Sequence, residues 1–425
     1  MTFCFPALLL AACASGSGGG GTGGQTSAGS GGRGGSASGG STGTGGATNT
    51  GGSTGSGGIS ASGGNTGSGG TTGSGGGVGS GGSTGHGGTG GGGPAGGSGT
   101  GGSGTGGNST GFTPYVCPTG VTSPTSFPSG STATRITAPS DAFNNNGNNF
   151  ETVEGPVWLN NALYVSEFGS TQKPPPSRIL KIDANDNVTI AFPSIVDTGS
   201  NGLAIDKDGN LVTANHGVGG LTKINVATGA VTTITSMYMG KRFNSPNDLT
   251  VRADGTIYFT DPAGYQGDMV QPNQGVYMLA PGASSAVELI STLNQPNGVG
   301  LSLDGHTLYV DDAGDGVMTY AVNADGTIVT PGTPLDPTDL AHKNGDGVAI
   351  DCAGDFYVVI GSTTVYVVNP SGSTIGSITG FPGASQIANV AFGGPDHKTL
   401  YITSQGTGTQ RGVYKLPMPV PGMPY

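Results

Sequence analysis

One pattern recurs six times in the last two-thirds of this chain. A polar residue opens an apolar strand, a turn follows about seven residues later, and a second apolar strand comes next. The openings recur at intervals of roughly 43 to 50 residues, a spacing that fits one four-stranded propeller blade per repeat. The polar residues that open the repeats are Glu154, Asn201, Asn247, Asn297, Asp346 and Asn389. We therefore predict an all-β fold, a six-bladed β-propeller.

The turns and the second strands support this prediction. Runs rich in aromatic and β-branched residues, such as Ile257–Phe259, follow the turns. Ala162, Gly209, Gly255 and Gly305 are expected in hairpin turns that need a positive φ. The stretch Thr134–Thr137 precedes the first repeat, and we expect it to add a strand to the last blade and close the ring.

The first part of the chain has a different composition. Residues 14–112 are almost wholly Gly, Ser and Thr, with Arg33 as the one charged side chain. Such a segment buries too little apolar surface to offset its ordering entropy, so we predict a disordered tether with a span of roughly 50–60 Å. We assign the propeller to residues 113–425, which are enough for one large core.

Residues 1–13 form a short apolar run that ends in Leu10-Ala11-Ala12-Cys13. This ending resembles a bacterial lipobox, which predicts a lipoprotein signal segment and lipidation of Cys13. The alternative is a chance cysteine after a small-residue cleavage site. The lipobox predicts a protein of the bacterial cell envelope, on the extracytoplasmic side, held to the membrane only by its N-terminal lipid.

The charge of the chain limits its partners. All 25 acidic residues lie beyond the tether with 13 of the 14 basic ones, which leaves a net charge of 13 − 25 = −12 there. This balance argues against nucleic acid and against a polybasic lipid-binding surface. We expect a monomer that acts on a small molecule.

Two cysteines remain if Cys4 is removed with the signal and Cys13 is lipidated. Cys117 and Cys352 can then form one disulfide in an exported protein. Two buried free thiols are the alternative.

Circular closure brings the six opening residues to one axis, where they form a ring of oxygen ligands. Glu154 and Asp346 supply two negative charges, and Asn247 and Asn297 supply carbonyl oxygens. With no His or Cys at an equivalent position, one divalent cation is predicted, with calcium favoured over Mg²⁺, Mn²⁺ or Zn²⁺. Asn201 and Asn389 occupy the same position in their repeats as these four residues. The alternative is that these residues only cap loop turns.

A polar rim is expected around this ring, because the ends of the second strands lie at the same face. Those ends are Glu167, Asn215, Asp261 and Asp312. We expect Asn201, His216, Arg242, Asp261 and Tyr265 to contact a substrate there. For His216 and Arg242 the alternatives are a polar rim residue and a solvated charge.

Several motifs, in this order and phase, resemble those of a known family. The stretches that carry the resemblance are Glu154–Trp158, Leu211–Gly217, Arg242–Asp248, Ile257–Pro262 and Gln295–Gly298. Together they resemble the senescence marker protein (regucalcin), gluconolactonase and luciferin-regenerating-enzyme family, whose members are six-bladed propellers. The resemblance implies a catalytic divalent ion at Glu154, Asn247, Asn297 and Asp346, with Asp346 as general base or nucleophile. Tyr265 and Arg242 match the family's substrate-binding positions only approximately.

These observations predict a metal-dependent lactone hydrolase that opens a sugar-acid lactone. The same metal centre also suits another lactonase or a phosphotriesterase. A third alternative, of another class, is a non-catalytic surface binding propeller with a structural metal.

Overall fold

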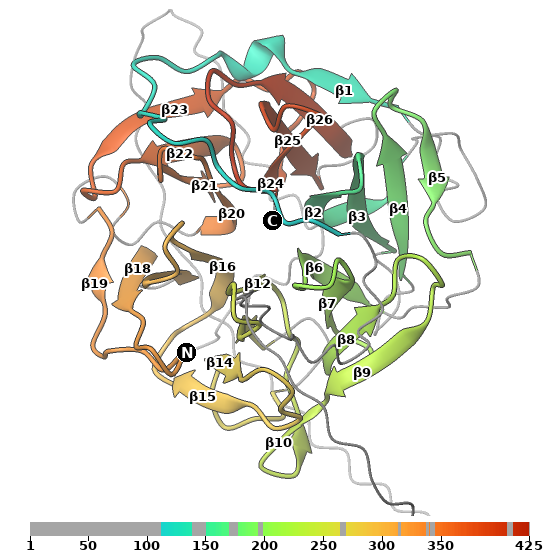
Figure 1. Ribbon diagram of the computed structural model, residues 1–425, viewed down its shortest axis with the longest axis vertical. Helices are drawn as coiled ribbons and strands as arrows, with labels where there is room; N and C mark the ends of the chain where they lie inside the picture. Colours follow the sequence, from blue (N-terminus) through green and yellow to red (C-terminus); the bar gives the residue numbers. More distant parts are fainter. Residues whose placement is uncertain are drawn as a thin grey trace, which may run out of the picture. The chain divides into compact units, whose positions relative to one another are not determined.

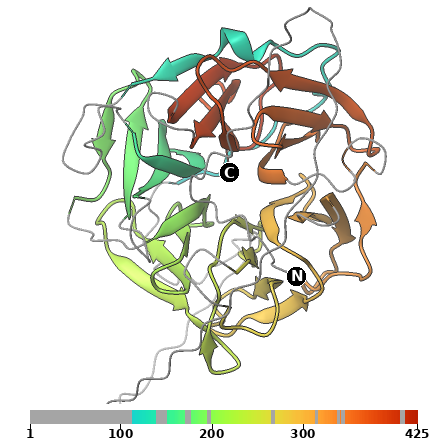
Figure 2. The same cartoon turned by 180° about the vertical axis from the view of Figure 1, so that it is seen from behind.

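A ring of six antiparallel sheets surrounds a central axis (Figure 1). The computed structural model describes residues 112–137, 150–169, 177–193, 199–263, 269–312, 316–336, 340, 345–405 and 411–424. The predictions for Cys13, for Tyr265 and for the tether as far as residue 111 lie outside the described residues. The six-bladed all-β propeller predicted from the repeats is confirmed, and Figure 2 shows the same ring from behind.

Each blade is numbered from the axis outward. The first blade contains β2 (Thr152–Leu159), β3 (Ala162–Phe168), β4 (Ser177–Asp183) and β5 (Val188–Ile190). The second contains β6 (Ser200–Ile205), β7 (Leu211–Asn215), β8 (Gly220–Ile224) and β9 (Val231–Thr235). The third contains β12 (Leu249–Val251), β13 (Ile257–Asp261), β14 (Gly275–Leu279) and β15 (Val287–Ile290). The fourth blade contains β16 (Pro296–Leu301), β17 (Thr307–Asp312), β18 (Gly316–Ala321) and β19 (Thr333–Pro334). The fifth contains β20 (Gly345–Ile350), β21 (Phe356–Ile360), β22 (Thr364–Val368) and β23 (Thr374–Thr379).

The sixth blade is built from both ends of the described chain. It contains β24 (Ile387–Gly393), β25 (Thr399–Ser404), β26 (Gly412–Pro417) and, outermost, β1 (Thr134–Ile136). Arg135 of β1 lies opposite Tyr414 of β26 in an antiparallel ladder. The predicted closing strand is therefore confirmed, and it covers the strand edge that the last blade would otherwise expose.

Two short elements lie outside the blades. A two-stranded hairpin, β10 (Met237–Tyr238) with β11 (Lys241–Arg242), connects the second blade to the third. The 3₁₀ turn η1 (Gly130–Thr132) precedes β1. Within the part of the chain that the structure describes, no helix has the length and apolarity to cross a membrane.

Burial falls from the axis outward. Every residue of β2 and β24 is buried, whereas β5 and β9 are mostly exposed or half-buried. Inner strands pack on both faces against neighbouring blades, which is why they are apolar almost throughout. Large aromatic side chains fill the space between blades; the rings of Tyr357 and Phe392, for example, pack edge to face at 5.1 Å between centroids.

The hairpin turns between the first and second strands lie at one end of the axis. Gly209, Gly255 and Gly305 adopt the expected positive φ. The expectation for Ala162 is wrong, because β3 already begins there; Asn160 and Asn161 take the left-handed conformation instead, which asparagine tolerates better than alanine.

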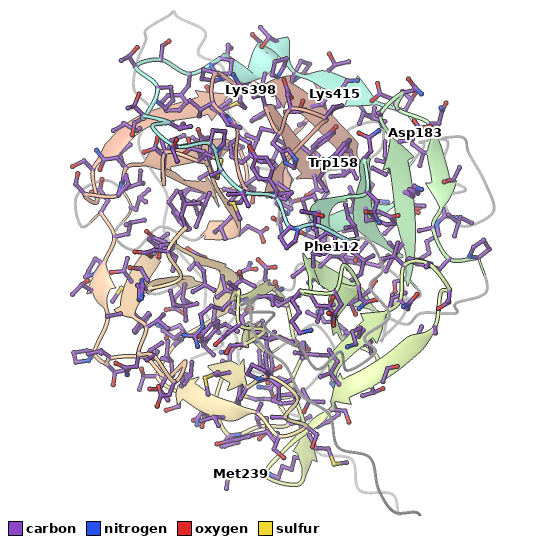
Figure 3. The ribbon with its side chains drawn as sticks, in the orientation of Figure 1. Phe112, Trp158, Asp183, Met239, Lys398 and Lys415 are labelled. Atoms are coloured by element: carbon purple, nitrogen blue, oxygen red, sulfur yellow. A yellow bond between two sulfur atoms is a disulfide. The ribbon has the colours of Figure 1, made fainter. Side chains whose placement is uncertain are left out.

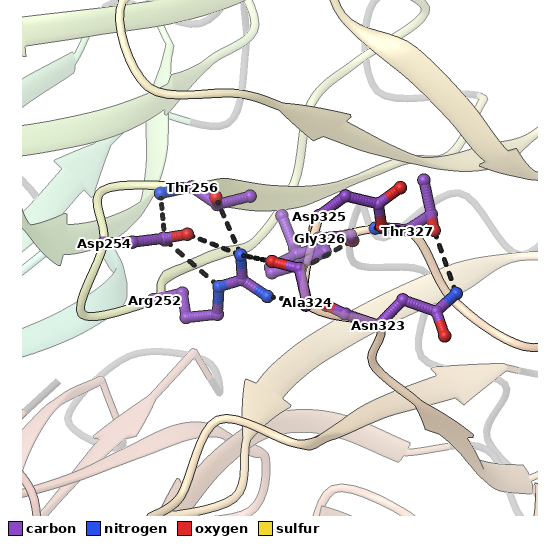
Figure 4. A network of polar contacts seen from close by, with 9 residues as sticks. Arg252, Asp254, Thr256, Asn323, Ala324, Asp325, Gly326 and Thr327 are labelled. Carbon is purple, nitrogen blue, oxygen red and sulfur yellow. Dashed lines mark hydrogen bonds and ion pairs between the residues drawn. The ribbon is translucent and has the colours of Figure 1, made fainter.

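These turns also join neighbouring blades. Arg252, in the turn of the third blade, pairs with Asp254, and its Nη1 donates to the carbonyl of Asn323 at 3.1 Å (Figure 4). Tyr258 Oη donates to the carbonyl of Gly326 at 2.7 Å. The outer turn of the fourth blade is thereby held against the third.

Two segments cross the turn end of the axis, and we call it the closed end. The N-terminal strap, residues 112–133, begins where Phe112 packs on Gly209 (Figure 3) and continues to Tyr115, whose ring stacks on His397. Cys117 then forms a disulfide with Cys352, the arrangement expected of an exported protein.

The C-terminal segment, residues 418–424, closes the axis beside the strap. The amide of Met423 donates to the carbonyl of Ile350, and the carbonyl of Pro424 accepts from the amide of Trp158, both at 2.9 Å. Met423 also lines an axial cavity of about 160 Å³, whose walls are largely the aliphatic side chains of the inner strands. Figure 1 shows the C-terminus near the centre of the ring.

Candidate active site

The six opening residues lie at the other end of the axis, which we call the site end. Five of them belong to inner strands, and Asn247 lies two residues before β12. In each of those five strands the ladder register shifts at this level, as it does between Glu154 and Val157 and between Gly345 and Val348. A local irregularity in a strand re-aims its side chains. The repeated pattern in the sequence therefore corresponds to a repeated irregularity at one height of the ring.

A glycine after the opening residue lets neighbouring inner strands approach at this level. A Cβ atom on Gly298 would lie 2.1 Å from the carbonyl oxygen of Asp346, and one on Gly347 would lie 2.0 Å from Cγ of Asn389. Neither position can hold a larger residue without moving the next blade. The glycines in the Asn-Gly and Asp-Gly pairs are therefore required by close packing around the ring.

Glu154 is buried and its carboxylate is surrounded by polar groups. Gln405 Nε2 donates to Glu154 Oε1, and Asn389 also hydrogen-bonds to this carboxylate. Burial, and next the nearby Asp248 carboxylate, raise the pKa of Glu154 to about 8, although these hydrogen bonds oppose the rise. The fold thus disfavours the ionised form of Glu154.

Asp346 is half-buried and lies in the same electrostatic environment. Burial, followed by repulsion from Glu154, Asp311 and Asp248, raises its pKa well above the usual range for aspartate. A hydrogen bond with the Asn297 side chain acts in the opposite direction. The structure therefore brings together three of the four predicted ligands, Glu154, Asn297 and Asp346.

The fourth predicted ligand, Asn247, lies in the adjacent blade. Its carbonyl oxygen accepts from the amide of Gly202 at 2.8 Å, and its amide donates to the carbonyl of Thr260 at 2.9 Å. Thr260 Oγ1 in turn donates to the carbonyl of Asn297 at 2.7 Å. The backbones that carry Asn247 and Asn297 are therefore connected through one threonine.

Two further carboxylates near the ring were missed in the sequence analysis. Asp248 accepts from the amide of Leu249 at 2.9 Å, and burial raises its pKa to about 7. Asp311 accepts from the amide of Gly345 at 3.1 Å through one oxygen, while its buried Oδ1 has no hydrogen-bond partner among the described residues. The sequence signal was present, because Asp248 stands where four other repeats have glycine and Asp311 belongs to an Asp-Asp pair.

The donor set fits a hard divalent cation. Glu154, Asp248, Asp311 and Asp346 concentrate negative charge around amide oxygens, and the groups that shift the pKa of Asp346 include no basic side chain. Among the described residues, no three His, Cys, Asp or Glu side chains form a group that could hold a metal ion. A cation here would therefore be bound by carboxylate and carboxamide oxygens together, the ligands that calcium prefers.

Asn201 and His216 form a second, neutral part of the site. Asn201 Nδ2 lies 3.5 Å from His216 Nε2, and both side chains are buried. Burial, and next the positive charge of Arg242, lower the pKa of His216 to about 3. His216 is therefore a neutral imidazole at physiological pH, able to donate through one ring nitrogen and accept through the other.

Arg242 and Asp261 hold in place the connection that leads to Asn247. Arg242 donates to the carbonyls of Phe243 at 3.0 Å and Asn244 at 2.5 Å. Asp261 is fully buried and accepts from the amides of Asn244 at 2.9 Å and Ser245 at 2.8 Å. A direct substrate contact by Asp261 does not agree with this burial, because both of its oxygens are turned to the backbone.

The same arrangement recurs at other ends of second strands. Glu167 accepts from the amide of Glu151 at 2.8 Å, and Asp312 accepts from the amide of Gln295 at 2.8 Å. Both acidic side chains are fully buried. The predicted outer rim is thus, in these blades, a set of buried acceptors that hold the chain as it enters the next inner strand.

The fold and this site define a class of protein: a six-bladed propeller with a buried ring of carboxylates and carboxamides at one end of its axis. Residues 152–406 match the model of the SMP-30/Gluconolactonase/LRE-like region. The chain belongs to this family, as the order of its motifs indicated.

Similar proteins include enzymes of this family. The chain is 30% identical over 279 residues to the gluconolactonase of Zymomonas mobilis, a match that covers 59% of this chain and 75% of that one. The solved gluconolactonase of Xanthomonas campestris is 26% identical with a TM-score of 0.52, over 64% of this chain and 87% of that one. Regucalcin from Agrobacterium tumefaciens shares the fold, with a TM-score of 0.52 and 19% identity over 65% of this chain and 92% of that one.

Proposed function

We propose that this protein is a divalent-cation-dependent hydrolase that opens the ring of a sugar-acid lactone, with calcium as the favoured cation. Family membership and the likeness to two gluconolactonases support the reaction type. The observation that carries the metal is the pair Glu154 and Asp346, because burial and then the Glu154 carboxylate raise the pKa of Asp346, which also hydrogen-bonds with the amide side chain of Asn297. A dication would turn this repulsion into attraction.

In this proposal Glu154, Asn247, Asn297 and Asp346 hold the cation. When bound, the cation would polarise the lactone carbonyl and stabilise the negative charge that develops on its oxygen. The neutral side chains of Asn201 and His216 suit hydrogen bonds to the hydroxyl groups of an uncharged sugar ring. Arg242 and Asp261 act indirectly, by fixing the connection that carries Asn247.

Asp346 is the proposed catalytic residue, because it is the half-buried carboxylate among the four ligands. As a base it takes a proton from water while the water oxygen adds to the carbonyl carbon; as a nucleophile it adds there itself. The bond from the carbonyl carbon to the ring oxygen then breaks, and that oxygen takes up a proton. On the nucleophile route this leaves an anhydride between the product and Asp346, which water then hydrolyses to free the Asp346 carboxylate and the product acid. The product carboxylic acid ionises, which releases one proton per ring opened.

The test is proton release from an aldonolactone, followed with a pH indicator in weak buffer. We expect turnover with calcium, loss of turnover after chelation, and recovery when calcium is restored. A panel of lactones of different ring size, with a phosphotriester, identifies the substrate class. Tight calcium binding without turnover on any member of the panel would contradict the proposal and support a surface binding propeller.

We also propose that the protein is a monomer anchored on the extracytoplasmic side of a bacterial envelope through Cys13. The lipobox-like ending at Cys13 and the polar composition of residues 14–112 support the anchor. Metabolic labelling with a radioactive fatty acid should mark the wild-type chain and leave Cys13→Ser unlabelled. Equal labelling of both proteins would contradict the anchor, and light scattering of the detergent-solubilised protein tests the monomer.

A further inference from the structure

Gln405 connects the proposed metal ligand Glu154 to the seam that closes the ring. It directly follows β25 in the sixth blade, whereas Glu154 belongs to β2 in the first. The Gln405 side chain is buried, and its Nε2 donates to Oε1 of Glu154. The backbone amide of Gln405 donates to the backbone carbonyl of Gln386 at 2.8 Å, which fixes the backbone from which the Gln405 side chain extends.

Arg411 holds Gln405 from the other side. Its Nε donates to the carbonyl oxygen of Gln405 at 3.3 Å, and its Nη1 forms an ion pair with Glu151, just before β2. The side chain of Arg411 is itself buried. Buried charge-assisted hydrogen bonds of this kind restrict geometry more than exposed pairs do.

The closing strand reaches this arginine directly. Arg135 of β1 donates to the carbonyl oxygen of Arg411 twice, from Nε at 3.2 Å and from Nη2 at 2.6 Å. A continuous set of contacts therefore runs from Arg135 through Arg411 and Gln405 to Glu154. The first link joins the closing strand to the rest of the sixth blade, the middle link lies within that blade, and the last joins it to the first blade.

The chemistry of Gln405 suits a supporting role. A carboxamide donates without carrying charge, so it can orient a carboxylate without neutralising it. A lysine or arginine at this position would pair with Glu154 and compete with a cation. Residues that orient metal ligands in this way commonly change metal affinity by about 10- to 100-fold when they are replaced.

We propose that Gln405 is a positioning residue for Glu154, and that Arg411 and the closing strand β1 set its place, so that cation affinity depends on closure of the ring. This inference rests on the proposed function, because it takes Glu154 as a ligand. Coupling of this kind is reciprocal: the cation would stabilise the closed seam by the same factor by which the seam strengthens cation binding.

The test is calcium titration by calorimetry on the full chain after removal of metal. Gln405→Met keeps the length of the side chain and removes its donor, and we expect affinity to fall by about 10- to 100-fold. Lys415→Met is the matched control, because it removes an ion pair from β26 to Asp186 of the first blade without contacting Glu154 or Gln405. We expect its affinity to stay within about twofold of the wild type.

Two reference variants separate the possible failures. Glu154→Gln should weaken binding more than Gln405→Met does. Wild-type affinity in Gln405→Met, beside a large loss in Glu154→Gln, would overturn the positioning role and leave the proposed function intact. Wild-type affinity in Glu154→Gln would instead remove the ligand assignment and the proposed function with it.

Arg135→Met provides a milder disturbance if Gln405→Met fails to fold. Arg135 is half-buried, and its replacement removes both donors to the Arg411 carbonyl. We expect calcium affinity to fall several-fold and the rise in melting temperature on adding calcium to become smaller, as linkage requires. An unchanged affinity in this folded variant would contradict the dependence on ring closure.

Discussion

The two ends of the propeller axis are built in opposite ways. The site end collects Glu154, Asp248, Asp311 and Asp346, and burial raises the pKa of each. Repulsion from neighbouring carboxylates adds to this for Glu154, Asp311 and Asp346, and no described residue hydrogen-bonds to one buried oxygen of Asp311. The closed end is made of hairpin turns, two crossing segments and a disulfide. One end therefore stores unfavourable electrostatic energy and the other supplies stability, which is the usual division between a functional site and its scaffold.

This contrast teaches that stability and chemistry can be changed separately in this protein. The inner strands connect the two ends, yet the groups that matter at each end differ. A change at the site end should alter activity strongly and leave the metal-free fold equally or more stable. A change at the closed end should do the reverse.

The largest expected effect is on activity, from Asp346→Asn at the site end. The amide keeps the shape of the side chain but removes one charge from the proposed cation site and removes the base or nucleophile. We expect kcat/KM to fall by about 10²- to 10⁴-fold, the range for loss of a catalytic acid or base, with weaker calcium binding. Lactone turnover and calorimetry measure both, and wild-type turnover in this variant would exclude Asp346 from the reaction.

The next effect is on stability, from replacing Cys117 and Cys352 together by serine. The disulfide joins residues 235 positions apart in sequence, so its loss frees a long loop in the unfolded chain and should cost about 2–4 kcal/mol. We expect a lower midpoint of chemical unfolding with kcat/KM within about twofold of the wild type. A large loss of turnover in the still-folded variant would show that the two ends are coupled.

The smallest effect is the pH dependence of the metal-free protein. The pKa of Glu154 is raised to about 8, and that of Asp248 to about 7. The folded chain therefore binds more protons than the unfolded chain between about pH 4 and pH 8. Stability is therefore fully present below the unfolded pKa values of about 4 and is lost progressively as the pH rises from there through 7 and 8.

Urea unfolding at pH 5.5 and pH 8.5 measures this difference, and Glu154→Gln should reduce it. Asp183→Asn is the control: hydrogen bonds from Asn187 lower the pKa of Asp183, so its contribution changes only at more acidic pH. Saturating calcium should reverse the trend, because the ligands bind a cation only when deprotonated. Greater stability of the metal-free wild type at pH 8.5 would contradict the picture of a site end that costs stability.

The sequence repeat predicted the architecture well because it fixes both the number of blades and the phase of each inner strand. A residue that opens a strand in every repeat must lie at one height around the axis, so Glu154, Asn297 and Asp346 could be placed together without coordinates. The closing strand at Thr134 could be predicted for a similar reason, since a ring of blades leaves one edge to cover.

The supporting contacts could not be predicted in this way. Gln405 and Arg411 lie outside the phase of the inner strands, and their partners Glu154 and Glu151 are about 250 residues away in sequence. Asp261 has the right residue type and the right strand end for a substrate contact, yet its oxygens turn to the amides of Asn244 and Ser245. Phase gives the height of a residue, whereas its direction depends on the twist of the blade and on which backbone donors lie nearby.

The described chain begins at Phe112 and ends at Pro424, and both residues lie at the closed end, among the side chains that line one pocket there. This placement matters for any use of the protein on a solid support. A bead or electrode joined to the chain just ahead of Phe112 would be attached at the closed end of the propeller, opposite the acidic site. Immobilisation through this part of the chain should therefore leave the site end uncovered.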